Sequence, residues 1–125
     1  MKMFKSKSSG LACLWLAALL PLPVQAGGEV TAEVLVEYCG VTAEDPDSHT
    51  AIAFCYGYID AALDYHHAIL PDGRRITCPP TTVTRQEVAV AVVEWAEIHP
   101  DEVNDNPPIH VVMQAAGDEW PCEEE

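Results

Sequence analysis

Residues 52–66 read IAFCYGYIDAALDYH, and they decide the fold of this 125-residue chain. Apolar side chains recur here at the 3.6-residue period of an α-helix, which predicts a long helix with one side in a core. Asp45 is the expected N-cap, and Pro46 the first helical residue, because the N–H that proline lacks has no partner there. We expect this helix to run to about Ala68. Its core side is formed by Ile52, Cys55, Ile59, Ala62, Leu63 and His66.

Two helices with clear end signals are expected on either side of this segment. One covers about residues 31–39 and ends at Gly40, since glycine commonly follows a helix C-terminus. The other opens at Thr84, where Thr84 and Glu87 have the spacing of a capping box. Pro100 is expected to close this helix, because proline does not fit a helix interior.

The C-terminal part predicts a fourth helix after a loop. Residues 101–106 are polar and acidic, and we expect them to form an irregular connection. Asn106-Pro107 is then the cap and first turn of a helix that ends at Gly117. The sequence contains no β-alternation of any length and no internal repeat. It predicts a small all-α domain of about four helices, stapled by disulfides.

The first 26 residues are expected to be a cleaved secretory leader, which leaves residues 27–125 as the mature domain. Lys2, Lys5 and Lys7 precede an uncharged apolar run, and Val24-Gln25-Ala26 offers small residues for cleavage. The run is about ten residues long, too short for a bilayer that needs about 20. We therefore expect an exported protein that is not inserted in the membrane once the leader is removed.

Four cysteines follow the leader, namely Cys39, Cys55, Cys78 and Cys122. An even number in an oxidising compartment predicts two disulfides, and the sequence alone allows three pairings. The helix layout favours Cys39–Cys55, because one ends a helix and the other lies in the next helix after a short turn. It also favours Cys78–Cys122, because antiparallel third and fourth helices bring those ends together.

Charge separates the leader from the rest of the chain. All 20 acidic residues follow Ala26, against Arg74, Arg75 and Arg85, so the mature chain has a formal charge of −17 and no lysine. Phosphate binding needs lysine and arginine, which argues against nucleic acid and anionic lipid as partners. The negative charge favours binding of a basic partner and accelerates its approach. The alternative is that the charge only keeps the surface solvated.

No constellation in the chain predicts catalysis. Asp60, Asp64 and His67 share one helix face and are the best metal candidates, although we favour a solvated polar face as their interpretation. Ser48 is the sole serine after the leader, and we interpret it as a capping residue. Each mature cysteine has an expected partner, which leaves no reactive thiolate. We expect a protein that is not an enzyme and holds no cofactor or metal.

Gly57 interrupts the long helix between Tyr56 and Tyr58. Glycine inside a helix costs about 1 kcal/mol relative to alanine, so its presence needs a reason. We favour close helix packing inside the monomer. The alternative is a flat patch that the backbone of another molecule approaches closely.

Two polar segments bounded by proline are not needed by the predicted core, and they are the expected partner-binding surface. They protrude as a turn and a loop, so they enter a cleft of a partner with little ordering cost. The alternative is that both are ordinary solvated connections. Their residues are Pro71, Asp72, Gly73, Arg74 and Arg75 in the turn, and Asp101, Glu102, Asn104 and Asp105 in the loop.

Four short motifs recur in order over nearly the whole mature chain: Cys55-Tyr56-Gly57-Tyr58-Ile59, Cys78-Pro79 ahead of Val83-Thr84, His99-Pro100 and Trp120-Pro121-Cys122. With these motifs the sequence resembles the Rap/Tai family, the immunity proteins of bacterial type VI secretion. One departure from the family pattern is Ala61, where such proteins often carry a second glycine, and another is the acidic, proline-rich stretch 104–108. The resemblance implies a periplasmic, mostly helical, non-catalytic dimer that binds and blocks a secreted peptidoglycan amidase.

Two other functions remain open at this point. A periplasmic acid-stress chaperone of the HdeA type is also small, helical and disulfide-bearing. Such chaperones gain strong positive charge in acid through lysines, whereas this mature chain has three arginines and five histidines. The other alternative is an orphan binding domain that keeps the family fold without a toxin. A neighbouring gene for an exported amidase would separate that case from an immunity protein.

Overall fold

The computed structural model describes residues 28–44, 46–71 and 74–123, and the expected leader lies outside these ranges. The described residues form five α-helices and no strand, which confirms the all-α prediction. In the same ranges no helix combines the length and the apolar character that crossing a membrane requires. The helices are α1 (Ala32–Cys39), α2 (Ser48–Ile69), α3 (Arg85–Ile98), α4 (Pro100–Asp105) and α5 (Pro108–Glu119).

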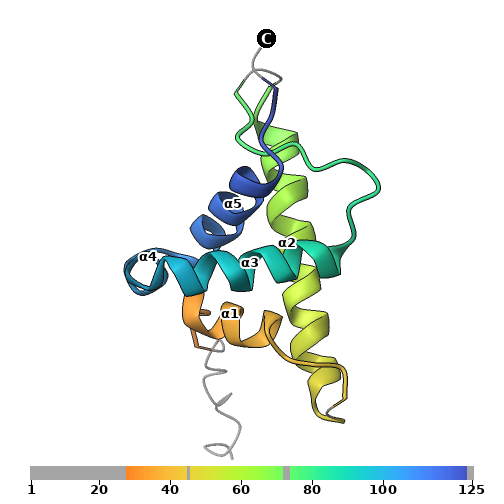
Figure 1. Cartoon of the computed structure of the whole chain (residues 1–125), viewed down its shortest axis with the longest axis vertical. Helices are drawn as coiled ribbons and strands as arrows, with labels where there is room; N and C mark the ends of the chain where they lie inside the picture. Colours follow the sequence, from red (N-terminus) through yellow and green to blue (C-terminus); the bar gives the residue numbers. More distant parts are fainter. Residues whose placement is uncertain (1–27, 45, 72–73, 124–125) are drawn as a thin grey trace, which may run out of the picture.

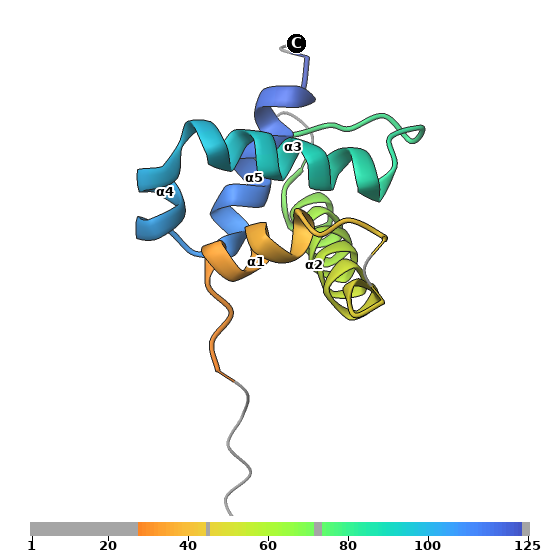
Figure 2. The ribbon, with the colours of Figure 1, turned by 60° about the horizontal axis from the view of Figure 1, so that its bottom comes forward.

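The core lies where α1, α2, α3 and α5 meet. Figure 1 shows α3 crossing α2, with α1 alongside α3, and Figure 2 shows α1 and α2 on the same side of α3. Each of these four helices contributes fully buried side chains to one cluster. Full burial of a valine, leucine or isoleucine contributes about 1.5–3 kcal/mol relative to exposure. The largest fully buried side chains are Leu35, Cys55, Ile59, Val92, Val111 and Val112.

Two disulfides staple this layout, and their pairing is the predicted one. Cys39, at the end of α1, is bonded to Cys55 in α2, with their Cα atoms 5.2 Å apart. Cys78, ahead of α3, is bonded to Cys122, after α5, with a Cα separation of 4.9 Å. The sequence separations are 16 and 44 residues. Cross-links over loops of this length stabilise a fold by about 3–4 kcal/mol.

Hydrogen bonds reinforce the second disulfide. Thr77 is buried, and its hydroxyl donates to the carbonyl of Ala116 at 2.7 Å. The N–H of Cys78 donates to the carbonyl of Trp120 at 2.8 Å. We call this region, made of Thr77, Cys78, Ala116, Trp120 and Cys122, the stapled end. It fixes the chain segment before α3 onto the C-terminal end of α5.

The predicted end signals of α1 and α3 are confirmed. Gly40 is the C-cap residue of α1. At the start of α3 the Thr84 hydroxyl accepts from the N–H of Glu87 at 3.2 Å, and the Glu87 carboxylate accepts from the N–H of Thr84 at 2.7 Å. The N–H and the hydroxyl of Thr84 both donate to the Glu87 carboxylate, the hydroxyl also at 2.7 Å, and these two hydrogen bonds hold the pKa of that carboxyl below its usual value.

The predicted starts of α2 and α5 are displaced. Helix α2 begins at Ser48 with Asp47 as its N-cap residue, so Pro46 precedes the helix, and the expected cap Asp45 lies outside the described residues. Helix α5 begins at Pro108, with Pro107 in the N-cap position. Because two prolines follow each other, the second one occupies the first helical position and the start moves by one residue.

Gly117 does not end α5, which corrects the prediction. The helix continues to Glu119. A Cβ atom at position 117 would lie 3.3 Å from the carbonyl oxygen of Ile76, closer than most such contacts. The glycine therefore permits the segment before α3 to pass close to α5, and its role is packing instead of termination.

Candidate partner-binding site

Residues 101–106 were predicted to be a loop, and this prediction is wrong because most of them form α4. Pro100 is the first residue of α4, and His99 is both the C-cap residue of α3 and the N-cap residue of α4. Val103 is 8% exposed and belongs to the core cluster. The side-chain amide of Asn104 donates to the carbonyl of Pro100 at 3.0 Å. One buried valine is thus enough to fold a polar segment back onto the domain.

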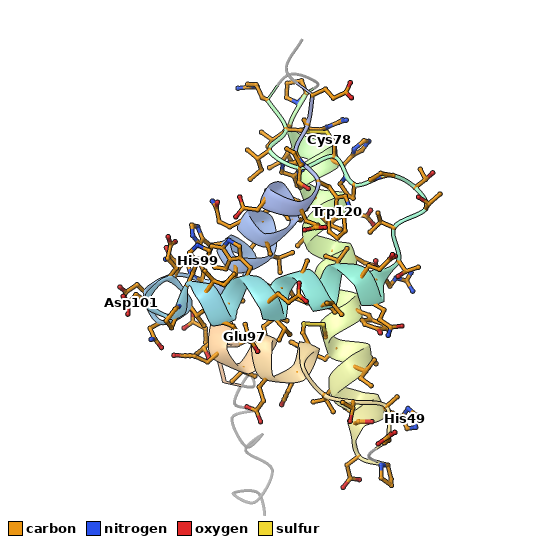
Figure 3. The ribbon with its side chains drawn as sticks, viewed as in Figure 1. His49, Cys78, Glu97, His99, Asp101 and Trp120 are labelled. Carbon is orange, nitrogen blue, oxygen red and sulfur yellow. A yellow bond between two sulfur atoms is a disulfide. The ribbon has the colours of Figure 1, made fainter. Side chains whose placement is uncertain are left out.

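The exposed residues of α4 carry concentrated negative charge. We call Asp101, Glu102, Asn104 and Asp105 the acidic corner; all four are exposed. Figure 3 shows Asp101 at the outer edge of the molecule. Asp101 and Glu102 lie in the first turn of the helix, where the helix dipole favours negative charge. The Glu102 carboxylate is 2.8 Å from the Nε2 atom of His110, which ties α4 to α5.

Trp95 supports the acidic corner from α3. Its indole N–H donates to the carboxylate of Asp118 at 3.0 Å. Its ring stacks on His99, with centroids 4.2 Å apart, and meets His110 edge-on at 6.3 Å. Side-chain contacts therefore hold this end of the molecule, in contrast to the covalent link at the stapled end.

The second predicted binding segment, residues 71–75, is described only in part. Asp72 and Gly73 lie outside the described residues. Pro71 and Arg74 are exposed, and the N–H of Arg74 donates to the carbonyl of Pro71 at 3.1 Å. This hydrogen bond joins the two described residues that flank the gap, and the predicted turn itself lies outside the described residues.

Arg75 is partly buried and is engaged with the end of α2. Its guanidinium donates to the carbonyls of Leu70 and His67 at 3.1 and 3.2 Å, which satisfies acceptors that a helix end leaves unpaired. In Figure 1 this end of α2 lies toward the C-terminus, whereas α4 lies at a different edge of the molecule. The structure therefore does not bring the two predicted segments together into one surface.

His66 lies behind the turn as a buried residue, 7% exposed. Its Nε2 atom accepts a hydrogen bond from the N–H of Ile76 at 3.2 Å. Burial lowers the pKa of His66, and the charges of Arg75 and His67 lower it further. An uncharged ring fits this site, because only the neutral imidazole offers an acceptor nitrogen.

The three metal-ligand candidates, Asp60, Asp64 and His67, do not form a metal site in the described residues. Asp60 pairs with Arg85, with 2.6 Å between the carboxylate and Nε, while Asp64 and His67 are exposed. Across the described residues, no group of three or more histidine, cysteine, aspartate or glutamate side chains could hold a metal ion. Ser48 is buried as the first residue of α2.

Gly57 is not closely packed inside the monomer, which corrects our interpretation. The residue is exposed, and a Cβ atom there would meet nothing within 4 Å. Small and aromatic side chains surround it on the same exposed side of α2. We call Ala53, Phe54, Gly57, Ala61 and Tyr65 the α2 outer face, in which Phe54 is 36% and Tyr65 60% exposed.

A cavity that we did not predict opens beside α3. Its volume is about 690 Å³, and it lies between the end of α1, the first half of α2 and α3. Val90, Val93, Glu94 and Glu97 line it from α3. Val90 and Val93 could have indicated this cavity in the sequence. They lie on the side of the helix opposite the buried stripe of Val88, Val92 and Trp95.

Comparison with known proteins identifies the family. A family model described as Rap1a immunity proteins matches residues 31–122, which include all five helices and both disulfides. No curated protein and no solved structure matches the chain. Immunity proteins act by binding a toxin partner. The chain belongs to the family of Rap1a immunity proteins.

Proposed function

We propose that this protein protects its own cell by binding and blocking a type VI secreted peptidoglycan amidase in the periplasm. The observation that carries the proposal is the family match over residues 31–122. Two disulfides support an oxidising compartment, because such bonds persist mainly outside the cytoplasm. The expected leader, residues 1–26, supplies the route of export.

Inhibition in this proposal is occlusion without chemistry. All four cysteines in the described residues are bonded in pairs, so none of them supplies a thiolate nucleophile. The protein then acts by covering the amidase cleft and excluding the peptidoglycan substrate. Binding through α4 has little conformational-entropy cost, because this helix is already folded onto the domain before it meets the toxin.

Of the two predicted binding segments, we propose the acidic corner as the one that meets the toxin. A chain with a charge of −17 attracts a basic partner and speeds its encounter. Asp101 and Asp105 extend that attraction to an exposed edge. The turn at 71–75 carries Arg74 and Arg75, whose positive charges would oppose the same basic surface.

We further propose that the α2 outer face mediates the homodimer that the family resemblance implies. This face exposes small and aromatic side chains around Gly57, where another backbone has open space to approach. Ala61→Glu would place a charge in such a contact, and Asp64→Glu on the same helix keeps the charge unchanged as a control. We expect Ala61→Glu alone to halve the mass in sedimentation equilibrium.

Co-expression tests the proposed function directly. The mature protein is expressed together with a periplasmic amidase from a neighbouring gene, where the genome encodes one, and cell lysis is followed. We expect the wild-type chain to prevent lysis and Asp101→Lys/Asp105→Lys to lose protection. Replacement of residues 71–74 by glycine and serine, which leaves Arg75 in place, should retain protection. If no periplasmic amidase binds the wild-type chain, the immunity proposal fails and the orphan binding domain takes its place.

A further inference from the structure

The cavity beside α3 is built by three separate parts of the chain. Residues 38–43 at the end of α1 form one wall, residues 49–56 of α2 a second, and residues 86–97 of α3 the third. Its volume of about 690 Å³ falls within the range of about 300–1,000 Å³ found for ligand sites. Two of these walls are packed helices, and the third is joined to α2 by the Cys39–Cys55 disulfide, so most of the cavity is shaped before any partner arrives.

The lining of this cavity joins apolar surface to negative charge. Ile52, Val90 and Val93 contribute apolar surface, and Val90 remains 49% exposed. Glu94 and Glu97 are both exposed and lie three residues apart on α3, so their carboxylates are neighbours on the helix. Figure 3 shows Glu97 on the side of α3 nearest α1. No lysine or arginine lines the cavity to balance these two charges.

We propose that this cavity receives a lysine or arginine side chain from the toxin, as an anchor separate from the acidic corner. Such side chains have an apolar stem and a cationic head, so the stem fits the valines while the head meets Glu94 and Glu97. The inference rests on the proposed function, since it names a chemical feature of the same partner. It adds a pocket for a buried side chain, which is where interfaces concentrate their binding energy.

A second copy of this chain is a poor occupant by the same charge criterion. The mature sequence holds three cations, of which Arg85 pairs with Asp60 and Arg75 binds the carbonyls at the end of α2. The complementary charge therefore comes from a different, basic protein.

Affinity measurements with matched variants test the proposal. The catalytically inactivated amidase is titrated with Glu94→Gln/Glu97→Gln and with Glu33→Gln/Glu123→Gln. Both variants lose two exposed carboxylates, but only the first pair lines the cavity. We expect the cavity pair to weaken binding at least about tenfold and the control pair less than about threefold. Equal affinities of the two variants would overturn the cavity proposal.

A cation placed inside the cavity gives a second test. Val90→Arg puts a guanidinium beside Glu94, where it competes with the toxin side chain. Since Val90 is half-exposed, the melting temperature should stay unchanged while toxin affinity falls at least as far as in the glutamine pair. Unchanged affinity in Val90→Arg would show that the toxin does not enter the cavity.

The absence of lysine after Lys7 makes cross-linking unusually direct. A carbodiimide joins a carboxylate to a contacting amine with loss of water, and the mature chain offers only its N-terminal amine. We expect amide bonds from Glu94 or Glu97 to a toxin lysine. If the glutamine pair weakens binding but no such amide bond forms in the wild type, the cation in the cavity is an arginine. If the wild-type chain fails to bind the amidase, the proposed function itself has failed. If the wild type binds and the two glutamine variants have equal affinities, only the cavity proposal is overturned.

Discussion

The stapled end and the acidic corner reach order by opposite means. At the stapled end a disulfide and two short hydrogen bonds join residues that are far apart in the sequence. The disulfide spans 44 residues, and the hydrogen bond from Thr77 to Ala116 spans 39. At the acidic corner one buried valine, a histidine–carboxylate contact and a stacked tryptophan hold α4. The difference indicates that stability is concentrated at one end, while the exposed residues of the other end are available for binding.

Removal of the disulfide at the stapled end should have the largest effect on stability. Cys78→Ser/Cys122→Ser is expected to cost about 2–5 kcal/mol of unfolding free energy, because the unfolded chain regains the freedom of a long loop. The Cys39–Cys55 disulfide closes a shorter loop, so its removal in Cys39→Ser/Cys55→Ser should lower the unfolding free energy by less. Denaturant titration of both variants measures the two values. A reversed order would contradict the view that stability is concentrated at the stapled end.

Loss of a single hydrogen bond at the same end should have an intermediate effect. Thr77→Val removes the donor to Ala116 but leaves that carbonyl with its helical partner, the N–H of Trp120. We therefore expect a loss of about 1 kcal/mol, the typical contribution of one hydrogen bond. Thr50→Val, at an exposed position of α2, is the control. Equal unfolding free energies for the two variants would show that the buried hydroxyl contributes nothing.

Acid should weaken the region around the turn through His66. Its pKa is lowered in the folded chain, so below the ordinary histidine value of 6.5 the unfolded chain binds the proton more readily. The stabilising contribution is complete above 6.5 and is lost as pH falls through the folded pKa. Thermal unfolding at pH 7.5 and 5.5 measures this. We expect His66→Gln to reduce the difference in melting temperature between the two pH values. An equal difference in His66→Gln and in the wild type would contradict this role.

The smallest effect on stability is expected at the acidic corner. Asp101→Asn/Asp105→Asn should change the unfolding free energy by less than about 0.5 kcal/mol, as exposed substitutions usually do. Asp101 is favoured by the start of the α4 dipole, whereas Asp105 is opposed at its end, so the two changes offset each other. The same variant should slow toxin association, most clearly at low salt. Unfolding of this variant would place the corner within the stabilising core.

Local patterns predicted the helices whose ends carry specific chemistry. The Thr84–Glu87 capping box and Gly40 are such signals, and both cysteine pairs followed from the order of the helices. Helix α4 was missed because it has six residues, too few to show a helical period. A single buried residue, Val103, then decides its position, and that contact depends on tertiary packing.

The cavity and the role of Gly57 were missed for a related reason. Both depend on what lies across from a residue, which spacing along the chain does not specify. Gly57 faces open space, and Gly117 faces the backbone at Ile76, although both lie inside a helix. Val90 and Glu94 become part of one site only because α1 and α2 complete its walls.

The Cys39–Cys55 disulfide has a further consequence because both of its residues line the cavity beside α3. The wall that joins α1 to α2 is covalently closed only after oxidation. A chain whose thiols are still reduced lacks this covalent link between the two walls. Under the proposed function, export would precede oxidation, so the cavity would reach its closed form only in the compartment where the toxin is expected to act.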